Sequence, residues 1–218
     1  MSARRRLSAE DRRTVLVEAG ARLFAERAYD AVLMEDVAAA AGVSRALVYR
    51  HFPSKRQLFI AVYEQAVEQL LTATQLDPAE PLPRQLEAAL NTHFEYFEAN
   101  PHSVLAANRV LASDPTVQSI IAGELAEMRH RVLDALGAEG AARARISSIL
   151  TSWLTFVRVL TVEWLEHRHY TRTEILDISI GALQGALGPV LGADAPSPTQ
   201  HHSNASADNS ADEQIRAR

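Results

Sequence analysis

Cysteine is absent from the 218 residues, which excludes disulfides, thiolate nucleophiles and zinc-thiolate sites. No phosphate-binding loop, dinucleotide fingerprint or serine-histidine-acid set is apparent in the sequence either. Strand patterns are scarce as well. We therefore expect a protein that is not an enzyme and that needs neither a metal nor a cofactor.

Lysine is nearly absent too, because Lys55 is the only one and the other 21 basic residues are arginine. Residues 1–58 carry eleven basic and seven acidic side chains, whereas residues 59–218 carry eleven and twenty. Non-specific affinity for DNA comes largely from released counterions, so the basic segment is expected to face a duplex. The overall pI near 5.9 argues against a general nucleoid coating protein.

The chain is rich in alanine, leucine, glutamate and arginine, and its apolar residues are mostly three and four positions apart. This spacing predicts an all-α fold of about nine helices. An apolar content of 47% allows a small N-terminal domain and a larger C-terminal domain with its own core. Breaks at proline and glycine predict helices over residues 9–27, 55–74, 82–99, 101–112, 115–136, 141–169 and 172–191.

Residues 33–52 have the outline of a helix-turn-helix, two short helices joined by a glycine-centred turn. Gly42 stands where the first of these helices would end in a left-handed residue. Ser44 would then cap the second helix. A preceding helix, with Ser8 and Asp11 as a capping box, completes an N-terminal three-helix domain.

The outward face of the second helix would carry guanidinium donors, a methyl group and a phenol, from Arg45, Ala46, Tyr49 and Arg50. Arginine can form two parallel hydrogen bonds to guanine, and a methyl group can lie against thymine. This set therefore suits the major groove of DNA. An ordinary helical hairpin with a solvated basic face is the alternative.

The flanks of the motif add candidate phosphate contacts. Ser54 and Gln57 predict a capping box at the start of the next helix. The Lys55 ammonium at this helix start would reach a phosphate. The alternative is that the position of this lysine is due to chance. A basic arm over residues 1–9 could reach a minor groove or phosphates, or remain a solvated tail. Its candidate contacts are Arg4, Arg5 and Arg6.

Residues 10–70 resemble the DNA-binding domain of TetR-type (TetR/AcrR) transcriptional regulators. The matching segments are 21–24, 29–30, 37–38, 41–44, 48–52 and 54–55, together with Leu58. One departure is Ala28, where the family usually has a glycine that ends the first helix in a left-handed turn. An alanine held in that conformation would cost about 1 kcal/mol.

The resemblance implies a homodimer that binds a near-palindromic operator in double-stranded DNA and represses transcription until a small-molecule effector releases it. An activating or ligand-independent regulator is the alternative. Bases and phosphates would be met by the residues that match the family's contacts: Ser44, Arg45, Ala46, Tyr49, His51 and Lys55.

The resemblance also implies a helical effector-binding and dimerisation domain over residues 75–192. Candidate pocket residues are the aromatic and polar side chains His93, Phe94, Phe97, Asn108, Arg109, Trp153, Phe156 and Arg158. If Arg158 faces the pocket, an anionic or carbonyl-bearing ligand is expected. Candidate dimer contacts on the glycine-lined last helix are Ile180, Gly181, Leu183, Gln184 and Leu187.

Two other interpretations concern the C-terminal half. Glu163, Glu166, His167 and His169 could hold a metal, although Glu163 and His167 at i, i+4 are also a routine helical charge pair. Residues 146–165 would suggest a membrane span if they were purer, but only twelve of these twenty are apolar. Arg158 and Glu163 would each cost about 2.5 to 3.5 kcal/mol at a bilayer centre. We therefore expect a buried helix and no membrane partner.

A third alternative is a helical interaction protein whose basic segment binds an acidic protein surface. The first residues form no apolar signal core, so we expect a cytoplasmic protein. Proline, serine, asparagine, aspartate and histidine dominate residues 193–218, which predicts a disordered tail.

Overall fold

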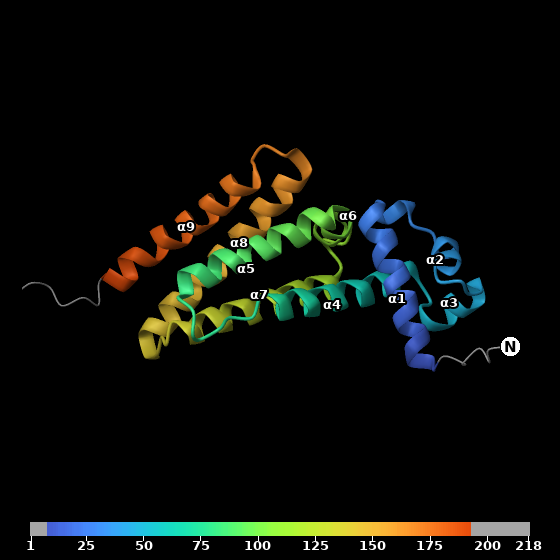
Figure 1. The fold of residues 1–218 in the computed structure, drawn as a ribbon, viewed down its shortest axis with the longest axis horizontal. Coiled ribbons are helices and arrows are strands. Elements are labelled where there is room, and N and C mark those ends of the chain that lie inside the picture. The colour runs from blue at the N-terminus through green and yellow to red at the C-terminus, as the bar shows by residue number, and fades with distance from the viewer. Residues whose placement is uncertain (1–7, 193–218) are drawn as a thin grey trace, which may run out of the picture.

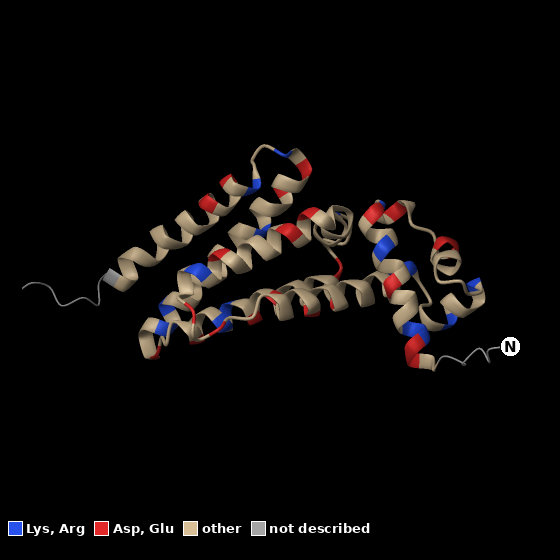
Figure 2. Cartoon of the chain, in the orientation of Figure 1, with Lys and Arg blue, Asp and Glu red and all other residues tan. Residues whose placement is uncertain are grey.

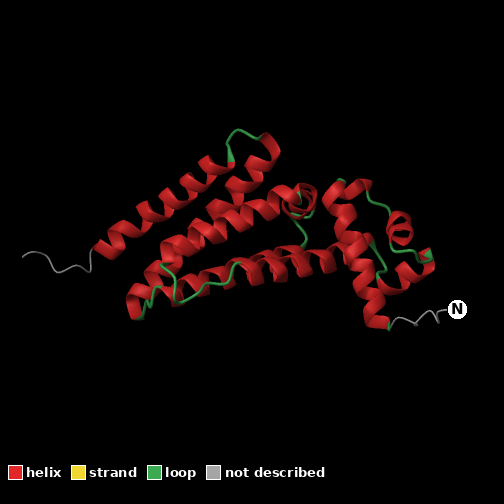
Figure 3. Ribbon diagram, in the orientation of Figure 1, coloured by secondary structure: helices red, strands yellow, loops and turns green. Residues whose placement is uncertain are grey.

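The computed structural model describes residues 8–192, and within that range it is helical throughout, with no β-strand (Figure 3). Two short turns interrupt the α-helices, the 3-10 turn η1 (Tyr29–Ala31) and the π-helical turn η2 (Ala106–Val110). The predicted all-α fold of about nine helices is confirmed over this range. The helices are α1 (Ala9–Glu26), α2 (Met34–Ala40), α3 (Arg45–His51), α4 (Lys55–Ala73), α5 (Leu82–Ala99), α6 (Pro101–Leu105), α7 (Pro115–Ala135), α8 (Gly140–His167) and α9 (Arg172–Gly192).

Serine hydroxyls begin three of the first four helices. Ser8 and Asp11 exchange backbone-to-side-chain hydrogen bonds of 3.0 Å each, which is the expected capping box at the start of α1. Ser44 and Ser54 accept hydrogen bonds from the backbone N–H three residues later, at 3.3 and 3.2 Å. Each cap contributes about 1 kcal/mol to stability. The sequence therefore locates the starts of α1, α3 and α4 correctly.

A left-handed glycine sets the angle between α2 and α3. Gly42 has φ +64°, and the N–H of Val43 donates to the carbonyl of Ala38 at 3.0 Å. These are the features of a Schellman ending, which satisfies carbonyls at the end of α2. Open space lies where a Cβ of residue 42 would be, so the glycine is required by backbone conformation and not by packing.

The end of α1 differs from the left-handed turn that is usual in the TetR family. Arg27 is extended, with φ −134° and ψ 148°, and Ala28 follows with φ −56°. Because neither residue is left-handed, the expected strain at Ala28 does not arise. The alanine is accommodated because the chain leaves the helix through an extended residue.

The helix predicted over residues 101–112 ends at Val110 and changes type within its length, because only residues 101–105 are α-helical. The α-helix ends at Leu105, and the N–H of Leu111 donates to the carbonyl of Ala106, five residues back, at 2.8 Å. This π-helical turn keeps Ala106 and Ala107 buried while Asn108 is turned toward α8. Such turns are rare in proteins, and those that occur often lie at functional sites.

Helix α4 belongs to both cores of the molecule (Figure 1). Its first half packs Leu58 and Phe59 against the helices of the N-terminal domain. Its last turns bring Leu70 into the core of the C-terminal domain, which is built on Phe94 and Leu150. In Figure 1 the N-terminal helices α1 to α3 lie at one end of an elongated molecule, and α9 lies along the other.

The two C-terminal helices differ in how much of their apolar surface is covered. Both α8 and α9 are long and apolar enough to cross a membrane by length and composition alone. In the most apolar stretch of α8 44% of the residues are buried, against 22% in that of α9. Figure 2 shows no charged residue along the later turns of α9. An uncharged face of α9 is therefore left uncovered in a single chain.

Replacing Gly42 with alanine is expected to lower the free energy of unfolding by about 1 to 2 kcal/mol, because alanine is strained at positive φ. The matched control is Gly123→Ala. Gly123 lies exposed inside α7, with open space at the Cβ position, so alanine there should stabilise by about 0.5 to 1 kcal/mol. Urea denaturation measures both changes. Two shifts of the same sign would contradict this account of the turn.

Candidate nucleic-acid interface

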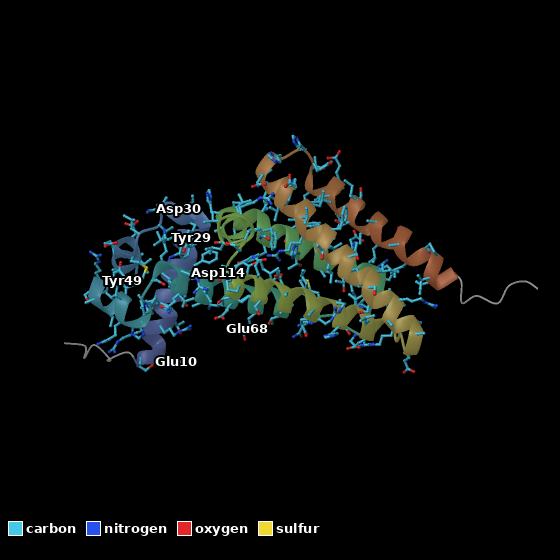
Figure 4. All side chains as sticks on the ribbon, turned by 180° about the vertical axis from the view of Figure 1, so that it is seen from behind. Glu10, Tyr29, Asp30, Tyr49, Glu68 and Asp114 are labelled. Atoms are coloured by element: carbon cyan, nitrogen blue, oxygen red, sulfur yellow. The ribbon has the colours of Figure 1, made fainter. Side chains whose placement is uncertain are left out.

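The exposed face of α3 forms a short platform, and the opposite face of the helix packs on the N-terminal core. Val48 is fully buried in the N-terminal core and anchors the helix. Arg45, Ala46, Tyr49 and Arg50 are exposed, and Ser44 is exposed at the N-cap. Figure 4 places Tyr49 at the outer end of the molecule, away from the C-terminal domain. The structure thus brings together the predicted base-contacting side chains on one accessible face.

An acidic side chain on α2 restrains the first arginine of this face. The Arg45 guanidinium forms an ion pair with the Glu35 carboxylate, with 2.8 Å between Nε and Oε1. The same guanidinium lies over the Tyr49 ring, 5.3 Å from its centroid. Both members of the ion pair are exposed, so the pair is weak and exchangeable for a nucleic-acid acceptor.

The ammonium of Lys55 is used inside the protein. It donates to the backbone carbonyls of Tyr29 and Asp30, at 2.8 and 3.3 Å. It also lies 4.6 Å from the centroid of the Tyr29 ring. These contacts tie the start of α4 to η1, so two of its three N–H donors are engaged before any phosphate is present. His51 is half-buried at the end of α3. Arg4, Arg5, Arg6 and the predicted tail over residues 193–218 lie outside the described residues.

A second polar contact joins the N-terminal domain to the C-terminal one. The Arg56 guanidinium on α4 donates to both carboxylate oxygens of Asp114 and to the Thr116 hydroxyl. Asp114 also caps α7, accepting from the N–H groups of Thr116 and Val117. The hydrogen bond from Arg56 lowers the pKa of Asp114 to about 2, and the backbone donors act in the same direction. In Figure 4 Asp114 lies where the two parts of the molecule meet.

A buried arginine gathers four elements of the C-terminal half. Arg158 on α8 donates to Asn108 at 2.9 Å, to Glu124 on α7 at 3.2 Å and to the Tyr63 hydroxyl on α4 at 2.7 Å. Its side chain is 8% exposed and that of Glu124 is 1% exposed. Burial raises the pKa of Glu124 and of Tyr63, and the Arg158 charge opposes both rises.

The prediction missed Tyr63 and Glu124 as members of this cluster. Glu124 could have been noticed as a carboxylate on the apolar stripe of α7, three residues after Ile121 and four before Met128. Tyr63 gives no such signal, because an aromatic residue on the inner face of a helix is ordinary core.

A cavity of about 60 Å³ adjoins this cluster, between the end of α4 and helices α5, α7 and α8. Its wall is largely apolar, and His93, Trp153 and Arg158 from the predicted set contribute to it. Phe94 and Phe97 are buried in the surrounding core, and Asn108 holds Arg158 from the outer side. Three of the eight predicted pocket residues therefore line this cavity.

The structure does not bring Arg109 or Phe156 to the cavity. Arg109 lies at the surface and donates to the carboxylates of Glu163 at 2.5 Å and Glu166 at 2.5 and 2.9 Å. The π-helical turn explains this, because it turns Asn108 toward α8 and leaves Arg109 exposed. Phe156 is 41% exposed on the outer side of α8.

The candidate metal cluster is occupied by an arginine. Ligand atoms of Glu163, Glu166 and His167 lie within 4.8 Å of one another at the surface. Arg109 donates to both carboxylates, and His167 approaches Glu163 at 3.5 Å. His169 stacks on His167 instead of joining the cluster, with 5.5 Å between ring centroids. The arrangement is that of a surface ion-pair network.

The predicted dimer residues on α9 divide between an inner and an outer face. Leu183 is buried in the core of its own chain, so it is not available to a partner. Gly181 and Gln184 are exposed, and Ile180 and Leu187 are half-buried. The open apolar face lies on another side of α9, where α8 and α9 form a groove of about 390 Å³. Its lining includes Ser152, Phe156, Ala182 and Ala186.

Helices α1 to α3 form a head that exposes the capped recognition helix α3. Helix α4 joins this head to the helices α5 to α9, which form the body. This architecture defines a helix-turn-helix DNA-binding protein. Residues 16–62 match the sequence model of the bacterial regulatory proteins of the tetR family. The DNA-binding domain is therefore of the TetR type, and the chain resembles TetR-family transcriptional regulators.

Several curated relatives are similar over parts of the chain. The transcriptional activator FasR of Mycolicibacterium smegmatis is 28% identical over 133 residues, which are 60% of this chain and 59% of FasR. The regulator CymR of Pseudomonas putida is 29% identical over 80% of this chain and 91% of CymR. The repressor KstR2 of Rhodococcus jostii is 34% identical over 44% of this chain and 47% of KstR2. The chain thus spans about three fifths or less of FasR and KstR2.

The fold is also that of solved transcriptional regulators. A tetR-family transcriptional regulator from Streptomyces coelicolor superimposes with a TM-score of 0.77 at 23% identity, covering 86% of this chain and 85% of that one. A transcriptional regulator from Rhodococcus sp. Rha1 gives a TM-score of 0.67 at 22% identity, covering 83% and 96%. The structural similarity therefore extends over both the head and the body.

The Arg56–Asp114 contact predicts an acid dependence of stability. Because the folded pKa of Asp114 lies below its ordinary 3.8, its carboxylate contributes stability above about pH 4. That contribution is lost as the pH falls toward 2. In Asp114→Asn the helix cap is kept, since asparagine also caps well, but the charge is removed. Urea denaturation from pH 5 to 3 should show a shallower loss of stability for the variant, and parallel curves would contradict this role.

Proposed function

We propose that this protein is a sequence-specific transcriptional regulator, and not an enzyme, that binds a near-palindromic operator as a homodimer in the cytoplasm. It represses transcription and is released by a small-molecule effector. The observation that supports the proposal most is the exposed platform of α3, held by the left-handed Gly42 and the Ser44 cap. Such a helix fits the major groove of B-DNA.

The residues of the platform divide into base and phosphate contacts. Arg45 and Arg50 supply guanidinium donors for guanine, and the Ala46 methyl suits a thymine. Ser44 is the N-cap and His51 the last residue of α3, and with Tyr49 they supply hydroxyl and imidazole groups for phosphates or bases. The Lys55 ammonium retains one donor for a phosphate, and its larger contribution is to hold η1 against α4. Arg4, Arg5 and Arg6 are proposed as further contacts to a minor groove or to phosphates.

The open face of α8 and α9 supports dimerisation. Exposed apolar side chains at Phe156, Val159 and Ile178 lie on these two helices, with 41, 55 and 37% of their surfaces accessible. Gly185 and Gly188 have open space where a Cβ would be, so their use is not close packing within the chain. A partner helix could approach closely there. Two heads related by the dimer axis would read half-sites about 34 to 36 Å apart.

The cavity supports control by a small molecule. The Thr74 and Leu76 side chains, at and just beyond the end of α4, form part of its wall, so a ligand that enlarges it shifts α4. Helix α4 carries Lys55 and Arg56 at its other end, which fix the head. A ligand that prefers the shifted conformation would draw the population away from the DNA-binding one.

Activation is the second candidate, because the relative FasR is named as an activator whereas KstR2 is named as a repressor. Transcription in vitro from the promoter upstream of the protein's own gene distinguishes the two. Lower transcript yield on adding the protein supports repression, and a higher yield supports activation.

DNA binding is tested by gel shift with the sequence upstream of the protein's own gene. Arg45→Ala should weaken specific binding by about 5- to 150-fold, the equivalent of one bidentate base contact. Glu35→Gln should strengthen binding, because it frees Arg45 and removes a negative charge beside the groove. The matched control is Glu68→Gln, the same change on α4 and far from Tyr49 in Figure 4. Equal competition by scrambled DNA, or an unchanged Arg45→Ala, would contradict the proposal.

Dimerisation is tested by sedimentation of an Ala186→Arg variant. Ala186 lines the groove of α8 and α9, so an arginine there would bury an unpaired charge against the partner. We expect the dissociation constant of the dimer to rise by about two orders of magnitude. Ala122→Arg makes the same change at an exposed position of α7 and should leave the dimer intact. A monomeric wild type would contradict this part of the proposal.

A further inference from the structure

The wall of the C-terminal cavity is apolar except at a few positions. Leucine, valine, alanine, methionine and tryptophan side chains supply most of it. Only two of its side chains are cationic, Arg131 and Arg158, and none is acidic. The remaining polar groups are Thr74 and His93. The chemistry of a ligand must therefore be decided by what these four side chains still offer.

Both cations are already neutralised by carboxylates. Arg158 lies 3.2 Å from Glu124, and its Nε and Nη2 atoms also donate to Asn108 and Tyr63. Arg131 lies 2.8 Å from Glu127 and also donates to a backbone carbonyl of α4. An anionic ligand would thus add a net negative charge to a buried site that is already balanced. Such a charge is costly in a low-dielectric interior.

One polar side chain of the wall has no partner. Both ring nitrogens of His93 are buried without a hydrogen bond, and the residue is 5% exposed. The Thr74 hydroxyl, in contrast, donates to the carbonyl of Leu70 at 2.8 Å. Burial, aided by the Arg158 charge, lowers the pKa of His93 to about 3, so its imidazole is neutral at physiological pH. A neutral imidazole offers one N–H donor and one acceptor nitrogen.

We propose that this cavity recognises an uncharged, mainly apolar molecule through a single hydroxyl group that hydrogen-bonds to His93. A hydroxyl both donates and accepts, so it pairs with either ring nitrogen. This inference rests on the proposed function, because it names the chemical class of the effector. It differs from the anionic or carbonyl-bearing ligand expected if Arg158 faces the pocket, because the charge of that guanidinium is already balanced by Glu124.

The cavity has room for a small group and adapts to a larger one. Its volume of about 60 Å³ is well below the 300 to 1,000 Å³ typical of drug-sized ligands. Met128, an unbranched and flexible side chain, lines it, and such residues repack readily. A compact alcohol is therefore the suitable probe.

The test is a titration of the full chain with three probes that share a six-carbon chain: hexan-1-ol, hexanoate and hexylammonium. Trp153 lines the cavity, so its fluorescence reports occupancy, and the Tm gives a second measure. Hexan-1-ol should give a saturable signal and raise the Tm. Each ion should bind at least about tenfold more weakly, because its charge finds no free counter-charge at the wall.

Two variants separate the hydrogen bond from the charge balance. His93→Leu should weaken hexan-1-ol binding by about fivefold, the equivalent of one hydrogen bond. His102→Leu is the matched control at an exposed position of α6 and should leave the affinity for hexan-1-ol unchanged. Glu124→Gln leaves Arg158 without its counter-charge, so the preference for hexan-1-ol over hexanoate should narrow or reverse.

Three outcomes would overturn the inference. These are hexanoate binding to the wild type as tightly as hexan-1-ol, His93→Leu leaving the affinity for the alcohol unchanged, or no response to any probe. The titration contains no DNA, so its outcome is independent of the gel shift. A protein that binds its operator but fails here contradicts only this inference, and the converse contradicts only the proposed DNA binding.

Discussion

The buried charge of Arg158 is the constraint on which the arrangement of the C-terminal half depends. A guanidinium stays protonated in a protein, and taking it out of water costs several kcal/mol unless its donors are paired. Here the pairing comes from α4 through Tyr63, from η2 through Asn108 and from α7 through Glu124. These three hydrogen bonds form together only when the elements keep this relative placement. The cluster therefore specifies how the helices are arranged more than it adds to stability.

Helix α4 carries this constraint to the other end of the molecule. Tyr63 in its middle is fixed to Arg158, and Lys55 and Arg56 at its start are fixed to η1 and to Asp114. The helix spans both cores, so it behaves as one rigid element. A change at its C-terminal end is transmitted to the head only if one of these contacts yields. One of them, Arg56–Asp114, is partly open to solvent, since the arginine side chain is 42% accessible.

Local signals in the sequence determine the head of the molecule almost completely. Gly42, Ser44 and Ser54 each act within a few residues of themselves, so the turn and both helix starts could be predicted. The body could not be predicted to the same degree. Arg158 gives the same sequence signal whether its charge is free in a pocket or balanced, because Glu124 is 34 residues away and Tyr63 is 95. The π-helical turn has no local signature either, and it decides that Asn108 faces inward while Arg109 pairs at the surface.

The open face of α8 and α9 lies far from α3, and this distance would amplify a small movement near the cavity in the proposed mechanism. In Figure 1 these elements lie toward opposite ends of the molecule, with α4 between them. If the partner chain fixes α8 and α9, a small tilt of α4 at the cavity becomes a larger displacement of α3. The proposed two-fold operator would tolerate little displacement, because both recognition helices of a dimer would have to enter successive major grooves on one side of the duplex. A small hydrogen-bonded alcohol acting near Thr74 and His93 could then suffice for release, since it need only favour the tilted state and not break the contacts of α3 with DNA.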